Sequence, residues 1–100
     1  METANNCIEL NTLKNKLKSK NEIVIIDVRS NEEYNEKHIP NAINIPLDKL
    51  ENEAKTFDKN KFYVTACGKG GSRSAAGAEK LKQMKFKALW LGGGTFGWFD

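Results

Sequence analysis

A lone cysteine stands at the start of a short stretch rich in glycine and positive charge. Cys67 follows the apolar run YVTA, and the six residues after it are Gly68, Lys69, Gly70, Gly71, Ser72 and Arg73. Glycine adopts backbone angles that other residues avoid, so this stretch can curl tightly. In a curled loop that leads into a helix, successive N–H groups can point inward and form an anion site. The pattern predicts a thiolate under a cradle for a small anion.

The charges around this cysteine suit a nucleophile. The thiolate is the reactive form of cysteine, and nearby positive charge stabilises it. Only two of the 16 basic residues are arginines, Arg29 and Arg73. Arginine presents a rigid, always charged fork that holds an anion at two points, so we expect both to matter geometrically. The competing interpretation is structural, because lone cysteines are often small buried hydrophobic residues.

Cofactor patterns are absent around the loop. The stretch lacks the phosphate-loop and dinucleotide-binding spacings. No second cysteine or histidine lies nearby to complete a metal site, so we expect neither metal nor cofactor. His38 is the only histidine. It could pair with Cys67, although its place in a proline-bounded turn favours a hydrogen-bonded structural role. Cys7 could resolve an oxidised Cys67 or lie buried in a first strand.

Two stretches have the pattern of sheet strands. Residues 22–28 (EIVIIDV) are apolar and mostly β-branched, interrupted only by Asp27, which is typical of a strand covered on both faces. Residues 61–66 (KFYVTA) end directly before Cys67. Shorter strands are expected at 7–10, 42–45 and 87–91.

Helical patterns separate these strands. Asn11 is the expected N-cap of a lysine-rich helix over 12–20. Ser30, with Glu33 three residues later, has the capping-box pattern of a second helix start. Further helices are expected over 46–57 and 74–85.

This alternation favours an α/β sandwich built on a mainly parallel sheet. In such sheets the loops after the strands meet at one edge, where ligands bind. Cys67 and residues 27–29 both follow strands, so we expect them at that edge. In the glycine-rich tail GGGTFGWFD, Phe96 and Trp98 are expected to pack beside the loop or close the core.

Composition limits the remaining possibilities. A chain of 100 residues suits one core, so residues 1–100 are expected to form a single domain. The net charge of +3, from scattered lysines, argues against nucleic acid as a partner. No run is long enough to cross a membrane, and no secretory signal is visible. We expect a cytoplasmic monomer in which both cysteines are thiols.

Several motifs together resemble one family. The segments IIDVRSNEEYNEKHIPNAINIP, RSAAGAEKL and LGGGTFGW, with the strand that ends in Cys67, resemble a single-domain rhodanese, a thiosulfate-type sulfurtransferase. The resemblance implies a rhodanese-like three-layer sandwich: a five-stranded, mainly parallel sheet with helices on both faces. It also implies that Cys67 carries a persulfide and that Asp27 and Arg29 support the loop. The implied partners are a small anionic sulfur donor and a thiol acceptor, which could belong to a protein.

The loop departs from the family pattern in length. A rhodanese loop usually reaches its arginine five residues after the cysteine, whereas Arg73 is six after Cys67. The longer spacing resembles phosphatases of the cell-division-cycle type and certain arsenate reductases. Against that likeness, Ala66 stands where those phosphatases usually carry a histidine. Lys37 and Asn41 also replace usual glycines, and asparagine tolerates left-handed angles.

Three functions therefore stay open. The first is sulfur transfer from thiosulfate or a similar donor through a Cys67 persulfide, held by the N–H groups of residues 68–73, with Lys69 and Arg73 stabilising the donor's charge. The second is a Cys-x5-Arg phosphatase or arsenate-reductase-like enzyme. The third is a catalytically idle rhodanese-like binding module, which would have no need of a charged glycine loop.

Overall fold

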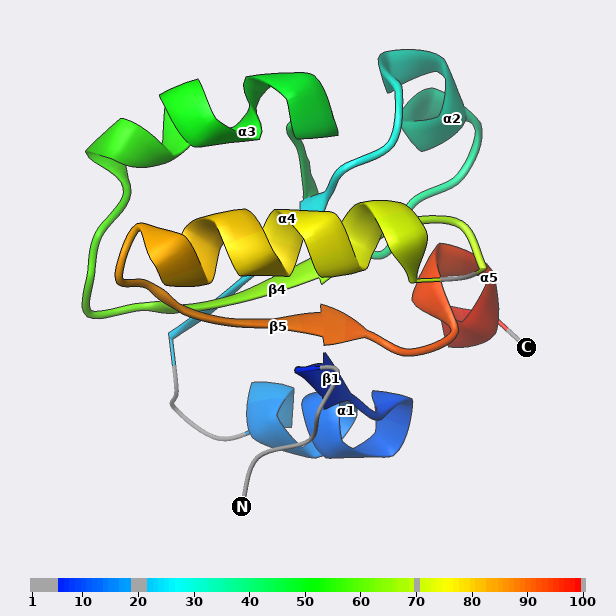
Figure 1. Ribbon diagram of the computed structural model, residues 1–100. Helices are drawn as coiled ribbons and strands as arrows, with labels where there is room; N and C mark the ends of the chain where they lie inside the picture. The colour runs from blue at the N-terminus through cyan, green and yellow to red at the C-terminus, as the bar shows by residue number, and fades with distance from the viewer. Residues whose placement is uncertain (1–5, 19–21, 70, 100) are drawn as a thin grey trace.

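A parallel sheet lies at the centre of the protein (Figure 1). The computed structural model describes residues 6–18, 22–69 and 71–99. Within these residues the sheet has five strands in the spatial order β1-β5-β4-β2-β3, and each neighbouring pair is parallel. The strands are β1 (Cys7–Ile8), β2 (Ile23–Asp27), β3 (Ile43–Asn44), β4 (Phe62–Ala66) and β5 (Lys87–Leu91). The two apolar stretches that the sequence marks most clearly are thus neighbours at the middle of the sheet.

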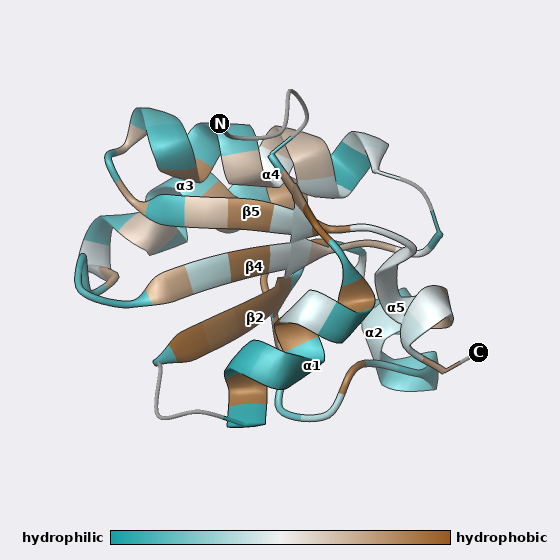
Figure 2. Ribbon diagram, turned by 90° about the horizontal axis from the view of Figure 1, so that it is seen from below, coloured by the Kyte–Doolittle hydropathy of each residue, from teal (hydrophilic) through white to brown (hydrophobic). Residues whose placement is uncertain are grey.

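Helices cover both faces of this sheet, as expected. In Figure 1 α3 and α4 lie on one side and α1 on the other, while α2 and α5 lie near the end toward which the strand arrows point. Figure 2, turned by 90°, shows α2 and α5 again at one end of the sheet. The helices are α1 (Leu10–Lys18), α2 (Asn31–Glu36), α3 (Leu47–Glu53), α4 (Ser72–Gln83) and α5 (Gly94–Trp98), with a 3-10 turn, η1 (Ala54–Thr56).

Each face of the sheet has its own apolar core. Successive residues of a strand point to opposite faces, and in β4 Tyr63 joins one core while Val64 joins the other. Leu81 of α4 is fully buried in the first core, and Leu13 of α1 is fully buried in the second. Burying one such leucine side chain contributes about 1.5–3 kcal/mol. Two covered faces explain why residues 23–26 are continuously apolar.

Helix starts differ in part from the predictions. Ser30 caps α2 with the predicted capping box, in which its side chain and that of Glu33 each accept a backbone N–H. The prediction for Asn11 was wrong, because α1 begins at Leu10 and Asn11 lies inside it. Residues 19–20, the end of that predicted helix, lie outside the described residues. Asn41 has a φ of 69°, the left-handed angle that asparagine tolerates.

Two corrections concern the region after Cys67. The helix predicted over 74–85 begins at Ser72, so Ser72 and Arg73 belong to the first turn of α4 and not to the loop. The glycine-rich tail, to which no element was assigned, contains α5. None of the helices in the described part of the chain combines the length and the apolar composition needed to cross a bilayer.

Candidate active site

Cys67 lies at the carboxyl edge of the sheet, directly after β4. The N–H of Val28 donates to the carbonyl of Ala66 (2.9 Å), which ties the segments after β2 and β4 together. The side chain of Cys67 is 4% exposed, and its Sγ lies 3.4 Å from Oγ of Ser74 in the first turn of α4. Helix N-termini favour negative charge. The cysteine is therefore almost fully buried at the border of an apolar core and lies beside the N-terminal end of a helix, which favours an anion.

Ser74 is a site residue that the sequence did not single out. It is fully buried, and its Oγ also lies 3.4 Å from the carbonyl of Gly71. A small polar residue one turn into a helix is common and carries no signal by itself. A buried hydroxyl that contacts the sulfur of Cys67 is visible only in three dimensions.

The loop after Cys67 rests on α5. The N–H of Thr95 donates to the carbonyl of Cys67 (2.7 Å), and the N–H of Phe96 donates to the carbonyl of Gly68 (3.1 Å). In a trans peptide the N–H points opposite to the C=O. The N–H groups of Gly68 and Lys69 therefore point away from α5. The tail thus fixes the orientation of the first two peptides of the loop.

Close packing, and not an unusual backbone angle, requires glycine at position 71. Gly71 has a φ of −121°, which any residue adopts, so the expectation that it supplies special backbone freedom was wrong. A Cβ placed there would lie 2.5 Å from the ring of Trp90. Gly70 lies outside the described residues. Lys69 is exposed at the surface of the loop.

Arg73 reaches sideways to α2. Its Nη1 and Nη2 donate to Oε1 and Oε2 of Glu33, at 2.9 and 3.2 Å. The two side chains are 44% and 40% exposed. Hydrogen bonds from Arg73 and from the N–H of Ser30 lower the pKa of Glu33 to about 2. The same ion pair raises the pKa of Arg73, to which negative charge on Cys67 also contributes.

Asp27 and Arg29 form a buried pair beside this site. Nε and Nη2 of Arg29 donate to the carboxylate of Asp27 at 2.9 and 2.7 Å, and Nη2 also donates to the carbonyl of Lys37. The side chains are only 2% and 1% exposed. The hydrogen bonds to Asp27 raise the pKa of Arg29 above its ordinary value. The centroid of the Phe96 ring lies 5.8 Å from the Arg29 guanidinium, so this pair lies beside α5.

The single histidine has a structural setting. Nδ1 of His38 lies 2.9 Å from the carbonyl of Tyr34, and the two rings stack with centroids 3.8 Å apart. Cys7 and Cys67, both within the described residues, are thiols and not a disulfide. Cys7 is half-buried in β1. Phe96 and Trp98 divide the roles expected of them, because Phe96 packs on Gly68 and Trp98 packs against the core around α1.

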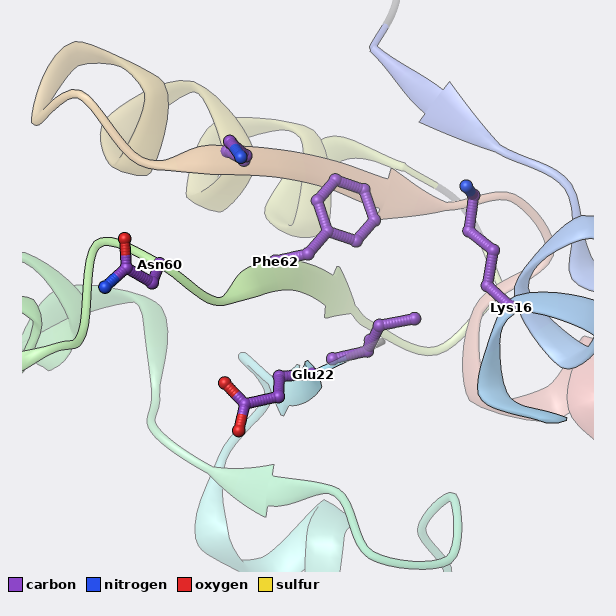
Figure 3. Close-up of a pocket in the computed structure, with 6 residues that line it drawn as sticks. Lys16, Glu22, Asn60 and Phe62 are labelled. Carbon is purple, nitrogen blue, oxygen red and sulfur yellow. The ribbon is translucent and has the colours of Figure 1, made fainter. Parts of the chain in front are cut away.

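Two hollows flank the sheet at opposite ends. A groove of about 510 Å³ adjoins Arg73 and is lined by Val28, Arg29, Ser30, Pro46, Leu47, Asp48, Arg73 and Lys80. A second hollow, of about 230 Å³, is shown in Figure 3, with Lys16, Glu22, Asn60 and Phe62 labelled. Its lining includes the first residues of β2, β4 and β5, so it lies at the amino edge. Of these two hollows, the groove beside Arg73 is the one that adjoins the segments that position Cys67.

Comparisons with known proteins agree with this arrangement. The chain is 37% identical over 83 residues to the thiosulfate sulfurtransferase GlpE of Coxiella burnetii, a match that covers 82% of this chain and 77% of that protein. The crystal structure of a rhodanese-like domain protein from Staphylococcus aureus superposes with a TM-score of 0.84 at 37% identity, covering 100% of this chain and 93% of the other.

A rhodanese-related protein from Thermoplasma volcanium gives a TM-score of 0.82 at 31% identity, covering 93% of this chain and 89% of that one. The sequence also matches the family described as "Rhodanese-like domain" over residues 9–100. The family match over most of the chain, together with these relatives, shows that the chain belongs to the rhodanese-like domain family.

Proposed function

We propose that the protein transfers sulfane sulfur from thiosulfate, or a similar small anionic donor, to a thiol acceptor through a persulfide on Cys67. The observation that carries this proposal is the position of the Cys67 sulfur, which is almost fully buried and lies 3.4 Å from Oγ of Ser74 in the first turn of α4. The likeness to a thiosulfate sulfurtransferase at 37% identity supports the choice of donor.

The reaction takes two displacement steps. In the first, the Cys67 thiolate attacks the outer sulfur of thiosulfate. A new S–S bond forms on Cys67, the S–S bond of the donor breaks, and sulfite leaves with its electron pair. In the second, the thiolate of the acceptor attacks the outer sulfur of the persulfide, and Cys67 leaves as a thiolate. Covalent catalysis of this kind replaces one difficult transfer by two easier ones.

The surrounding groups have separate tasks in this proposal. The N–H groups of residues 68–73 hold the anionic persulfide, as preorganised donors hold an oxyanion. Ser74, whose Oγ lies 3.4 Å from the sulfur, donates its hydroxyl hydrogen to the thiolate. Lys69 attracts the anionic donor, and Arg73, at the edge of the loop, interacts with the charge of the donor. Asp27 and Arg29 support the site through α5.

Mass spectrometry after thiosulfate treatment tests the proposal. The wild-type protein should gain the mass of one sulfur atom, and peptide mapping should place it on Cys67. The variant Cys67→Ser should gain none, whereas Cys7→Ser should still gain one. Release of sulfite in equal amount accounts for the second product. A wild-type protein that takes up no sulfur and instead hydrolyses an aryl phosphate would establish the phosphatase alternative.

The acceptor is tested with the loaded protein. A low-molecular-weight monothiol such as 2-mercaptoethanol should remove the added sulfur, return the protein to its original mass and itself become a persulfide. Arsenate should be neither reduced nor retained. If the added sulfur stays on Cys67 in the presence of excess thiol, the second step of the proposal is wrong.

A further inference from the structure

The geometry points to Glu33 as the residue that sets which donor charge the Cys67 loop accepts, by neutralising Arg73 at the edge of the loop. This inference rests on the proposed sulfur transfer and deepens it. It assigns a specificity-determining role to a residue of α2, an element that contributes nothing to the loop itself. Glu33 acts through Arg73 and is a positioning residue.

Arg73 and Glu33 form a bidentate ion pair. Both terminal nitrogens of Arg73 donate to Glu33, one to each carboxylate oxygen, at 2.9 and 3.2 Å. That bidentate geometry is the one in which a guanidinium would also hold a small oxyanion. Glu33 therefore occupies the arrangement that an anionic donor would otherwise take. The arginine remains 44% exposed and borders the groove that adjoins it.

Glu33 is itself held in place. Its Oε1 accepts the backbone N–H of Ser30 at 3.1 Å, as part of the capping box at the start of α2. The capping box of α2 thus holds the carboxylate in place independently of Arg73. Since its pKa is about 2, it carries its charge throughout any ordinary assay range. The negative charge that pairs with Arg73 is therefore present under all ordinary assay conditions.

The consequence follows from the charges of the donors. An unpaired Arg73 would present a full positive charge at the edge of the loop and would favour a dianion over a monoanion. Paired with Glu33, it presents close to none, and the preference falls. Removing the Glu33 charge should therefore raise the logarithm of the rate constant in proportion to the donor's negative charge. For a donor of charge −2 a few side-chain lengths from a unit charge in a water-like medium, Coulomb's law gives a change in the rate constant of about three- to tenfold.

The variant Glu33→Gln tests this directly. Glutamine keeps an oxygen that accepts the Ser30 N–H, so α2 keeps its cap. The measurement is the second-order rate constant for modification of Cys67, followed by peptide mass, with three reagents. These are thiosulfate (charge −2), methanethiosulfonate (−1), which transfers its outer sulfur and releases methanesulfinate, and iodoacetamide (0), which alkylates the thiolate and releases iodide.

The expected results differ between the reagents. Glu33→Gln should raise the rate constant about three- to tenfold with thiosulfate, about two- to threefold with methanethiosulfonate, and not at all with iodoacetamide. The gain should shrink as salt is added. Glu22→Gln is the matched control, because Glu22 is an exposed carboxylate at the amino edge of the sheet, at the opposite end from Arg73. It should change none of the three rates.

Two results would overturn the inference. One is an equal change with all three reagents, which would mean that Glu33 alters the thiolate and not the selection of the donor. The other is a lower rate with thiosulfate, which would mean that Glu33 holds Arg73 in a productive position. If the wild-type protein takes up no sulfur at all, the proposed function fails instead. Iodoacetate compared with iodoacetamide then still tests the charge effect on Cys67.

Discussion

The two arginines of this protein bind carboxylates in opposite surroundings. Arg29 and Asp27 are buried almost completely, whereas Arg73 and Glu33 are each about two-fifths exposed. Burial decides what each pair contributes. An exposed ion pair contributes at most about 1 kcal/mol to stability, so the Arg73 pair matters for the charge at the loop. A buried charge left without its partner is strongly destabilising, so the Arg29 pair matters for folding.

Asp27→Ala should therefore destabilise the protein severely. Arg29 would keep its charge in a place that is 2% exposed, with only the carbonyl of Lys37 left among its described side-chain partners. We expect the free energy of unfolding, measured with urea, to fall by about 3–5 kcal/mol. A small domain has about 5–15 kcal/mol in total. The variant should thus be marginally stable.

Two further variants separate the charge from the packing. Glu51→Ala breaks the exposed pair with Lys80 and should cost less than about 1 kcal/mol. Adding Arg29→Met to Asp27→Ala removes the stranded charge and should restore a large part of the loss. If Asp27→Ala costs no more than Glu51→Ala, the buried pair does not have the structural role assigned to it.

At the scale of elements, α5 is the piece that holds the loop. Its backbone N–H groups donate hydrogen bonds to the carbonyls of Cys67 and Gly68. Its first residue, Gly94, has a φ of 60°. A Cβ at Gly94 would lie 2.5 Å from the carbonyl oxygen of Cys67 and 2.4 Å from that of Gly68. Any side chain at this position would push the loop away from the helix.

Gly94→Ala should consequently impair both stability and sulfur uptake. Left-handed strain alone costs about 1–3 kcal/mol at a residue that is not glycine. The displaced loop should slow persulfide formation at least about tenfold, since misplacement by about 1 Å can cost a factor of about 100. The rate is measured by mass spectrometry at limiting thiosulfate, and the stability by urea unfolding.

Gly97→Ala provides the comparison within the same helix. A Cβ at Gly97 would meet nothing within 4 Å, and alanine favours a helix by up to about 1 kcal/mol over glycine. This variant should be as active as the wild type and no less stable. Equal rates of sulfur uptake in the two alanine variants would show that α5 does not position the loop.

Patterns that depend on neighbours in sequence predicted the fold well. The apolar run 22–28 marked β2, KFYVTA marked β4, and the spacing of Ser30 and Glu33 marked the start of α2. Each of these signals is local. By contrast α5 could not be predicted, because glycine-rich segments have low helix propensity. This short helix is held in place by its hydrogen bonds to the loop.

The same distinction holds for the candidate site. The position of Cys67 at the carboxyl edge follows from strand order and could be predicted. The contact between Cys67 and Ser74 and the pairing of Arg73 with Glu33 join residues whose relation depends on how helices pack. Glycine at position 71 was expected because of its backbone flexibility, whereas the structure shows that the ring of Trp90 on β5 leaves no room for a side chain there. No pattern in the sequence predicts such a close contact between residues of different elements.

At the scale of the whole molecule, the edge strands of the sheet are too short to favour pairing with another chain. Its three longer strands, β2, β4 and β5, are interior, and the edge strands of the described sheet, β1 and β3, have two residues each. Long exposed edges invite pairing with another chain, and short ones prevent it. Of the exposed large apolar side chains that the structure describes, Leu17 lies on α1 and Ile43 on β3, while Phe96 and Phe99 lie within α5 and directly after it.

We therefore predict that this chain is a monomer in solution. Sedimentation equilibrium over a hundredfold range of concentration should give a constant mass of 11.2 kDa. Ile43 lies on the edge strand β3 and is 43% exposed, so Ile43→Lys is the informative variant. If the wild-type mass rises with concentration and that of Ile43→Lys does not, the β3 edge pairs two copies and the short strand is insufficient protection. A rise in both would place the interface elsewhere, and in either case the argument from edge length fails.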